Sequence, residues 1–353
     1  MAFENKRPKV IVFDWGDTLM QVNPAYTNAM VDWPEVAEVP GPAEMLAALR
    51  GRYRLVLASN AADSSPGQIR TALDRVSLGQ YIEEIFTMVR VQARKPELAF
   101  FRGVEQACGA RPEEMLMVGD RFEDDVLGAW RAGWMTAWYN PTGRAAPGLL
   151  PLHSIELRDL RELPEKINGR RLPEVRDCLT WYLQVGTPRR LLDHVEKVAQ
   201  VSYLMALWLR NAGHPADPIL AHRGGLLHDL AKLQADETKG ESHAERAGQM
   251  LEERGQPELA RIARRHLLFS LLSEEDRPIT WEEKVVCFAD KLVEGSQLVS
   301  FEERLAALQA RYRHLGSLEP ERLERLRSAL NEAQNELCAA MGFAPEELLP
   351  RLR

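Results

Sequence analysis

The stretch VIVFDWGDTLM, residues 10–20, decides the fold of the first half of the chain. Four apolar residues run directly into the carboxylate of Asp14, a pattern typical of a short buried strand that ends at a polar site. The runs RLVLASN (54–60) and EMLMVGD (114–120) repeat this pattern and bring Ser59 and Asp120 to their ends. Because parallel strands end at one edge of their sheet, we expect these polar residues to form a single site.

Helical patterns separate these apolar runs. Two further strand patterns occur at IFTMVRV (85–91) and MTAWYN (135–140), and helix patterns cover residues 42–53, 96–109 and 124–133. Short strands that alternate with helices indicate βαβ units and a parallel sheet. We therefore predict an α/β, Rossmann-like domain over residues 1–167.

The pattern changes in the second half. From about residue 188 apolar residues recur at helical spacing, and no strand pattern is evident up to the C-terminus, which predicts an all-α domain. We place a linker at residues 168–187, the helical domain at 188–312 and a C-terminal helical extension at 313–353.

Composition narrows the function classes. The 353 residues carry a formal charge of −7, which does not favour a nucleic-acid surface. The four cysteines lie far apart and predict neither disulfides nor a thiolate metal site. No apolar run is long enough to span a membrane, so we expect a cytoplasmic protein without a membrane partner. The sequence does not predict the oligomeric state.

Four motifs of the first half, FDWGDTL, LASN, ARKPELAFF and VGDRFEDDVLGA, resemble in order and position those of the haloacid dehalogenase (HAD) superfamily. The resemblance implies a phosphatase in which Asp14 is the nucleophile and forms an acyl-phosphate, while Ser59 and Lys95 contact the phosphate. It implies a Mg²⁺ site built from Asp14, the main-chain carbonyl of Gly16, Asp120 and Asp125, with Asp124 as the alternative to Asp125.

The chain departs from the HAD pattern at Gly16. HAD phosphatases usually carry a second aspartate there as general acid/base, and here the next acid, Asp17, comes one residue late. Loss of such a group typically costs about 10²–10⁴-fold in rate. The segment between Asp14 and Ser59 is too short for a large cap, which disfavours dehalogenation and predicts an open site suited to a large substrate. The domain is thus either an active phosphatase or a weakened accessory.

Histidines and aspartates recur through the second half in the order H…HD…H…H…D. Each contribution comes from a different predicted helix: His194, His228 with Asp229, His243, His266, and Asp290. Helix bundles build metal sites from imidazoles and carboxylates that point inward in this way. Without a metal, so many buried ionisable groups would be costly, so we expect a metal centre.

This order resembles the HD superfamily of metal-dependent phosphohydrolases over roughly residues 188–300. The segments GLLHDLAK, HAE and ADKLVE resemble its symmetrical bis(5′-nucleosyl)-tetraphosphatase group. The resemblance implies two metals, one bound by His194, His228, Asp229 and Asp290, and the other by Asp229, His243 and His266. Such mixed ligands suit Fe, Mn, Co or Ni better than Mg²⁺ alone.

Lys232 lies on the same helical face as His228 and Asp229. It is expected either to grip a phosphate oxygen beside the catalytic Asp229 or to be a surface lysine. Four arginines flank the predicted site and either contact a polyphosphate or form ordinary surface pairs: Arg189, Arg190, Arg264 and Arg265.

Together these patterns predict a two-domain metal-dependent phosphohydrolase that acts on a phosphorylated small molecule or nucleotide. The HD domain would cleave a nucleotide-type phosphoanhydride or phosphoester, with a dinucleoside polyphosphate as the best guess. Two alternatives stay open. A nucleic-acid end-processing enzyme predicts a basic stripe and salt-sensitive binding. An HD enzyme with a non-catalytic HAD regulatory or dimerisation module predicts that Asp14 is dispensable.

Overall fold

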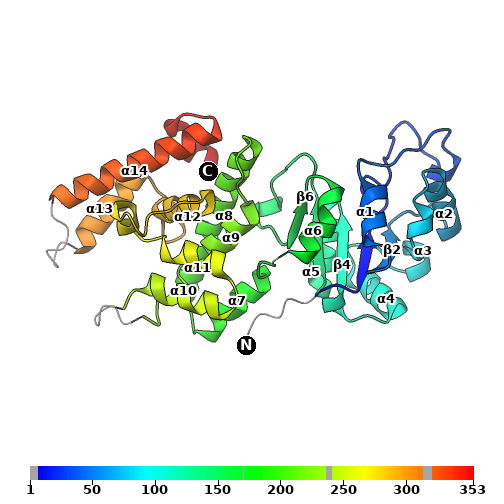
Figure 1. Ribbon diagram of the computed structural model, residues 1–353, viewed down its shortest axis with the longest axis horizontal. Coiled ribbons are helices and arrows are strands. Elements are labelled where there is room, and N and C mark those ends of the chain that lie inside the picture. The colour runs from blue at the N-terminus through cyan, green and yellow to red at the C-terminus, as the bar shows by residue number, and fades with distance from the viewer. Residues whose placement is uncertain (1–6, 170, 236–240, 313–319) are drawn as a thin grey trace. The chain divides into compact units, whose positions relative to one another are not determined.

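The computed structural model describes residues 7–169, 171–235, 241–312 and 320–353. The chain divides into two compact units (Figure 1). The α/β unit contains the described residues up to 147 and residues 152–171, and the helical unit contains residues 148–151 and the described residues from 172 onward. Among the described residues, no helix is long and apolar enough to cross a membrane.

A six-stranded sheet forms the centre of the α/β unit. All neighbouring strands are parallel, in the order β3-β2-β1-β4-β5-β6. The strands are β1 (Val10–Phe13), β2 (Arg54–Ser59), β3 (Glu84–Thr87), β4 (Met115–Gly119), β5 (Met135–Tyr139) and β6 (Ile155–Leu157). The predicted parallel α/β fold is confirmed, with two local differences. The edge strand β6 was not expected, and the expected strand over 85–91 ends early because Met88–Val91 form the short helix α3.

Helices cover both faces of the sheet (Figure 1). Alternate residues of β1 divide between two cores: Ile11 and Phe13 face one side, and Val10 and Val12 face the other. The first core is closed by α1 (Pro42–Leu49), α2 (Pro66–Arg75) and α6 (Leu163–Asn168), and the second by α4 (Leu98–Cys108) and α5 (Gly128–Ala132). Burial on both faces explains why these strands read as unbroken apolar runs.

The register brings the predicted site residues to one edge. Phe13 on β1 is level with Leu57 on β2 and with Val118 on β4. Asp14 and Asp120 therefore leave the ends of adjacent strands, where the chain order of the strands reverses and where parallel sheets bind their ligands.

The helical unit consists of α7 (Val175–Gln184), α8 (Arg189–Asn211), α9 (Pro218–Leu227), α10 (His243–Glu253), α11 (Pro257–Arg264), α12 (Trp281–Lys291), α13 (Phe301–Tyr312), α14 (Pro320–Met341) and α15 (Leu348–Leu352). The helical prediction is confirmed, except that the two-residue strands β7 (Val293–Glu294) and β8 (Gln297–Leu298) form an antiparallel hairpin after α12. The segment we expected to be a linker contains α7, whose Tyr182 hydroxyl donates to the carbonyl of Leu226 in α9.

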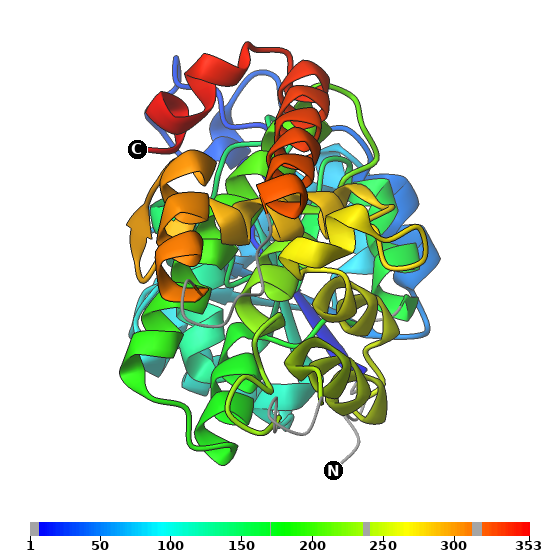
Figure 2. The ribbon, with the colours of Figure 1, turned by 90° about the vertical axis from the view of Figure 1, so that its left-hand side faces the viewer.

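Helices α8 and α9 pack closely against each other just before His228 and Asp229. A Cβ atom at Gly225 would lie 2.8 Å from the Cα atom of Ala199 on α8, so only glycine allows this approach. On another side of the unit, the long helix α14, orange to red in Figure 2, packs against α8 and α12. The apolar side chains of these helices share one core, which includes Met205, Phe288 and Leu337.

Two candidate active sites

Lys95 is the central cation of the site in the α/β unit. Its Nζ atom donates to Oδ1 of Asp14 and to Oδ1 of Asp125, each at 2.6 Å, and the lysine is 2% exposed. Burial alone would lower the pKa of Lys95, but Asp125 and Asp14 outweigh it and raise the pKa above its ordinary value. The lysine therefore remains charged and orients the carboxylate that we expect to act as the nucleophile.

Two side chains that the sequence motifs did not single out hold this arrangement. The buried Thr18 hydroxyl lies 3.2 Å from Oδ1 of Asp120 and 3.4 Å from Oδ2 of Asp14, so one residue touches both strand ends. The Asn60 side chain donates to the carbonyl of Lys95 and accepts from its backbone N–H, at 2.9 and 2.8 Å. A threonine in a polar loop and an asparagine after a strand carry no distinctive signal of these roles in a single sequence.

The carboxylates of Asp14, Asp120 and Asp125 meet, with one oxygen from each within 4.8 Å of the others. Burial and the neighbouring Asp14 raise the pKa of Asp120 to about 6, and burial raises that of Asp125 to about 7 although Lys95 opposes it. Burial is thus the main cause of both raised pKa values, and the neighbouring carboxylates add to it. A hard divalent cation such as Mg²⁺ suits this oxygen donor set.

The two adjacent aspartates after β4 point to different partners. Asp125 contacts Lys95 and also accepts from the backbone N–H of Arg121. The carboxylate of Asp124 forms an ion pair with the Arg121 side chain at 3.0 Å. Of the two alternatives, Asp125 is thus the one that belongs to the three-carboxylate cluster.

Gly16 and Asp17 lie in a tight turn at the edge of the site. Asp17 has a φ angle of +56°, and its Oδ1 atom accepts from the backbone N–H of Val22 at 2.9 Å. Its carboxylate is therefore engaged in the turn. Gly16 lines the pocket itself, but it brings no side chain.

The pocket around Asp14 has a volume of about 400 Å³ and an outer wall that the motifs did not predict. Val22, Asn28, Met30 and Trp33 supply this wall, and the Trp33 indole donates to the carbonyl of Asn28. These residues come from the segment between β1 and α1, and no cap domain is present among the described residues, so the expectation of an open site stays a prediction. The volume is in the range of small-molecule sites.

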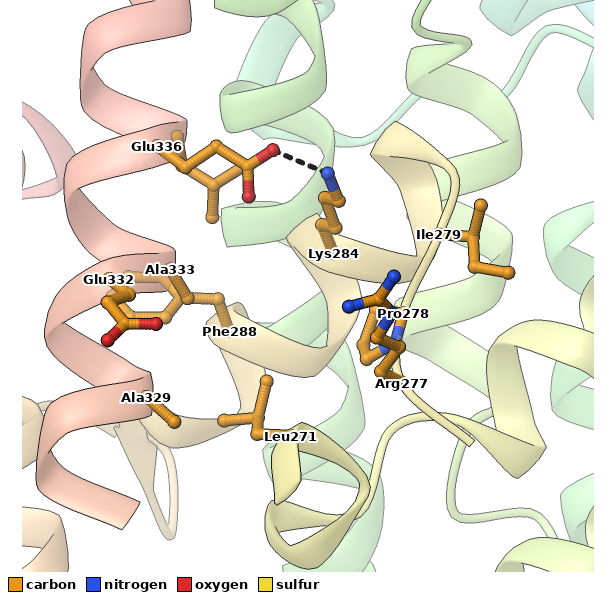
Figure 3. A pocket seen from close by; sticks show the side chains of 11 residues that line it. Leu271, Arg277, Pro278, Ile279, Lys284, Phe288, Ala329, Glu332, Ala333 and Glu336 are labelled. Atoms are coloured by element: carbon orange, nitrogen blue, oxygen red, sulfur yellow. Dashed lines mark hydrogen bonds and ion pairs between the residues drawn. The ribbon is translucent and has the colours of Figure 1, made fainter. Parts of the chain in front are cut away.

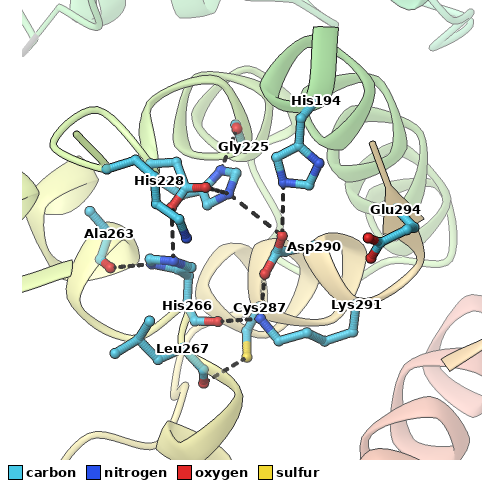
Figure 4. Close-up of polar contacts among 12 residues, drawn as sticks. His194, Gly225, His228, Ala263, His266, Leu267, Cys287, Asp290, Lys291 and Glu294 are labelled. Atoms are coloured by element: carbon cyan, nitrogen blue, oxygen red, sulfur yellow. Dashed lines mark hydrogen bonds and ion pairs between the residues drawn. The ribbon is translucent and has the colours of Figure 1, made fainter. Parts of the chain in front are cut away.

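In the helical unit, the HD residues gather around two aspartates. Oδ1 of Asp229 lies 3.3 Å from Nε2 of His243 and 3.4 Å from Nε2 of His266. Oδ1 of Asp290 lies 3.1 Å from Nε2 of His194 and 3.7 Å from Nε2 of His228 (Figure 4). His228 joins the two halves, because its Nε2 atom is also 3.5 Å from Oδ2 of Asp229. All six predicted residues therefore converge from α8, α10, α12 and the segments that follow α9 and α11.

Three of the histidines are held by backbone carbonyls through Nδ1. The partners are Gly225 O for His228 at 2.7 Å, Ala263 O for His266 at 2.6 Å and Gly295 O for His194 at 3.0 Å. A carbonyl can only accept, so Nδ1 carries a proton, and in the neutral imidazole the lone pair lies on Nε2. Metal-bound histidines typically show this second contact.

The donor atoms of the cluster suit divalent metal ions. Nε2 of His228 is buried and has no hydrogen-bond partner among the described residues, yet it points into the cluster. Burial lowers the pKa of His266 to about 4, so its imidazole is neutral. Neutral imidazoles beside buried carboxylates are the ligands that transition metals prefer.

Lys232 lies at the rim of this cluster. Its Nζ atom is 3.4 Å from Oδ1 of Asp229 and 3.2 Å from Nε2 of His243, while its side chain is 42% exposed. The flanking arginines are mostly engaged: Arg189 pairs with Asp193, Arg264 with Glu245 and Glu252, and Arg265 with Glu283. Lys232 is therefore better placed than these arginines to meet an anionic ligand.

A separate groove of about 550 Å³ lies between α12 and α14 (Figure 3). Lys284 reaches across it to Glu336, and Phe288 forms part of its apolar floor. No group of histidine, cysteine or carboxylate ligands among the described residues lies in this groove. The chemistry of the helical unit is thus concentrated on the HD cluster.

Comparison with known proteins agrees with both geometries. The HD domain family model matches residues 191–295, and a HAD-hydrolase-like family model matches residues 92–155. The chain therefore carries a HAD-hydrolase-like domain and an HD domain in the same polypeptide. Both domains, together with relatives named as phosphatases and nucleotidases, support a phosphoester hydrolase, and both families are metal-dependent.

Three relatives share parts of the chain. The uncharacterized protein MJ0778 of Methanocaldococcus jannaschii is 33% identical over 34% of this chain and 76% of its own length. Pyrimidine 5′-nucleotidase YjjG of Escherichia coli is 32% identical over 40% of this chain and 63% of its own length. Glyceraldehyde 3-phosphate phosphatase of Pyrococcus furiosus is 29% identical over 33% of this chain and 46% of its own length. The chain thus spans less than two thirds of the two relatives with a named activity.

Proposed function

We propose that the helical unit hydrolyses a nucleotide-type phosphoanhydride or phosphoester, with a dinucleoside polyphosphate as the best single guess. One divalent cation would be held by His194, His228, Asp229 and Asp290, and a second by Asp229, His243 and His266. The observation that carries this proposal is the buried Nε2 atom of His228, which lacks a hydrogen-bond partner among the described residues and faces both aspartates.

The side chains of the chain would have distinct tasks in this reaction. Two bound cations supply an activated water and neutralise charge on the phosphate. Asp229 would bridge them, because its Oδ1 atom is within 3.4 Å of two imidazoles and Oδ2 is near a third. Lys232 would donate to a non-bridging phosphate oxygen, since its ammonium reaches the same aspartate from the solvent side.

We infer that the α/β unit is a Mg²⁺-dependent phosphatase, or a weakened accessory of the same kind. Asp14 would attack phosphorus, while Lys95 and Ser59 stabilise the charge that develops on the phosphoryl oxygens. Mg²⁺ would be held by Asp14, the carbonyl of Gly16, Asp120 and Asp125. The pocket of about 400 Å³ favours a small phosphomonoester over a polymer end. The named activities of the nucleotidase and the glyceraldehyde 3-phosphate phosphatase are also of this kind.

The test measures hydrolysis of a dinucleoside tetraphosphate with Mn²⁺ or Fe²⁺, and of a nucleoside 5′-monophosphate and glyceraldehyde 3-phosphate with Mg²⁺. The wild type is compared with Asp14→Asn and Asp229→Ala. Asp193→Asn is the matched control, because Asp193 precedes a proposed ligand on α8 but pairs with the exposed Arg189.

We expect Asp229→Ala to abolish tetraphosphate cleavage, Asp14→Asn to abolish monoester cleavage, and Asp193→Asn to retain both. Unchanged tetraphosphate cleavage in Asp229→Ala would refute the assignment of the helical unit. Unchanged monoester cleavage in Asp14→Asn would favour a non-catalytic HAD module. If no form cleaved either substrate, oligonucleotide ends would become the next substrates to test.

A further inference from the structure

Lys291, the last residue of α12, is a buried lysine inside the HD cluster. It is 4% exposed, and its Nζ atom donates to Oδ2 of Asp290 and, at 2.9 Å, to the backbone carbonyl of His266 (Figure 4). Removing an ammonium group from water is costly unless charged and polar partners compensate for it. The two contacts of Lys291 are therefore the place to look for its role.

The two oxygens of Asp290 have different partners. Oδ1 faces the Nε2 atoms of His194 and His228, while Oδ2 faces Lys291. A partial rotation of the carboxylate would move Oδ1 away from the histidines, and the contact between Oδ2 and the ammonium opposes this rotation. Lys291 thus holds one oxygen toward the histidines that would share a cation with it.

The second contact reaches the other half of the cluster. His266 follows α11, outside regular helix, and its imidazole points to Asp229 while its own carbonyl accepts from Lys291. One ammonium therefore connects α12 to the backbone of a residue whose ring faces the bridging aspartate. The contacts of Lys291 thus include one residue from each of the two proposed metal sites.

We propose that Lys291 is a positioning residue that sets the geometry of both metal sites through Asp290 and His266 without itself contacting metal or substrate. This inference rests on the proposed metal centre of the helical unit. Lys291 is not among the metal ligands that the sequence pattern predicts.

The experiment measures Mn²⁺ affinity by electron paramagnetic resonance titration of the full-length chain, alongside the thermal unfolding temperature. The variants are Lys291→Met and Lys291→Gln, and the control is Lys284→Met. Lys284 lies two turns earlier on α12 and forms its ion pair with Glu336 of α14, which is not one of the proposed metal ligands (Figure 3).

We expect Lys291→Met to weaken Mn²⁺ binding by about 10–100-fold, the range found when residues that support metal ligands are removed. Excess Mn²⁺ should then restore much of the hydrolytic rate. Lys284→Met should keep wild-type affinity. If Lys291→Met failed to fold, Lys291→Gln would be measured instead, because it retains a donor but loses the charge, and we expect at least a 10-fold loss.

Wild-type Mn²⁺ affinity in a folded Lys291 variant would overturn the inference, as would an equal loss in Lys284→Met. These outcomes are separate from those of the proposed function. A wild type that binds Mn²⁺ but cleaves no phosphoester would refute the activity, and the affinity series would still test Lys291.

Discussion

Replacing Gly16 by aspartate is expected to raise the phosphomonoesterase activity of the α/β unit. Gly16 lines the pocket that also contains Asp14 and Lys95, so a side chain there would enter the site. The HAD resemblance places the general acid/base at this position. The nearby Asp17 is a poor substitute, because its carboxylate accepts from the backbone N–H of Val22.

The magnitude follows from two opposing effects. A general acid/base contributes about 10²–10⁴-fold, which corresponds to about 2.7–5.5 kcal/mol at about 1.36 kcal/mol per tenfold change. Against this, a Cβ atom at Gly16 would lie 2.8 Å from Cγ2 of Val22. Overpacking in a core costs about 1–3 kcal/mol, and the cost here should be at the lower end, because Val22 is 45% exposed and its side chain can move.

The assay is hydrolysis of p-nitrophenyl phosphate with Mg²⁺ in an Asp229→Ala background, which removes the contribution of the helical unit. Gly16→Asp is compared with Gly16→Asn, which has the same shape without the acid, and with the double variant Gly16→Asp/Val22→Ala. We expect an increase only with aspartate, largest in the double variant, and its loss on adding Asp14→Asn. An equal increase with asparagine, or none in a folded double variant, would refute the reasoning.

Three further outcomes follow from the packing and the charges. Lys95→Met should abolish monoester cleavage and lower the free energy of unfolding in urea by about 3–5 kcal/mol, because two buried carboxylates lose their cation. Gly225→Ala should lower the melting temperature more than Gly224→Ala, because its Cβ atom meets the backbone of Ala199 rather than the end of a side chain. Chelation should destabilise the helical unit by about 3 kcal/mol if metal is present at 100 times its dissociation constant, a shift that calorimetry should not find in Asp229→Ala.

The sheet and most of its site were predictable because both depend on short-range patterns. A buried parallel strand must be apolar on both faces, so a run such as VIVF followed by Asp14 indicates both the strand and the edge at which it ends. The HD cluster was predictable for a different reason, since its ionisable residues recur on apolar helices that would not otherwise bury them.

The remainder depends on contacts that one sequence does not display. Strand β6 has only three residues, and β7 and β8 have two each, so their pairing is fixed by neighbours rather than by periodicity. Lys291 stands at the end of a helix, where a cation is favourable and common. Only its burial distinguishes it from an ordinary lysine at such a position. The loop around Met30 and Trp33 becomes a pocket wall only through its fold.

The hydrogen bonds from Nδ1 of His228 and His266 have a consequence for how the centre takes up metal. Each imidazole donates to a carbonyl three residues earlier, in the last turn of the helix that precedes it, where backbone acceptors lack helical partners. These hydrogen bonds therefore favour the Nδ1-protonated tautomer of both histidines before a metal ion binds. Entry of the ion then requires neither proton exchange between ring nitrogens nor ring reorientation. The rate of uptake should accordingly follow how fast each aqueous ion sheds its own water, with Mn²⁺ and Fe²⁺ entering faster than Ni²⁺.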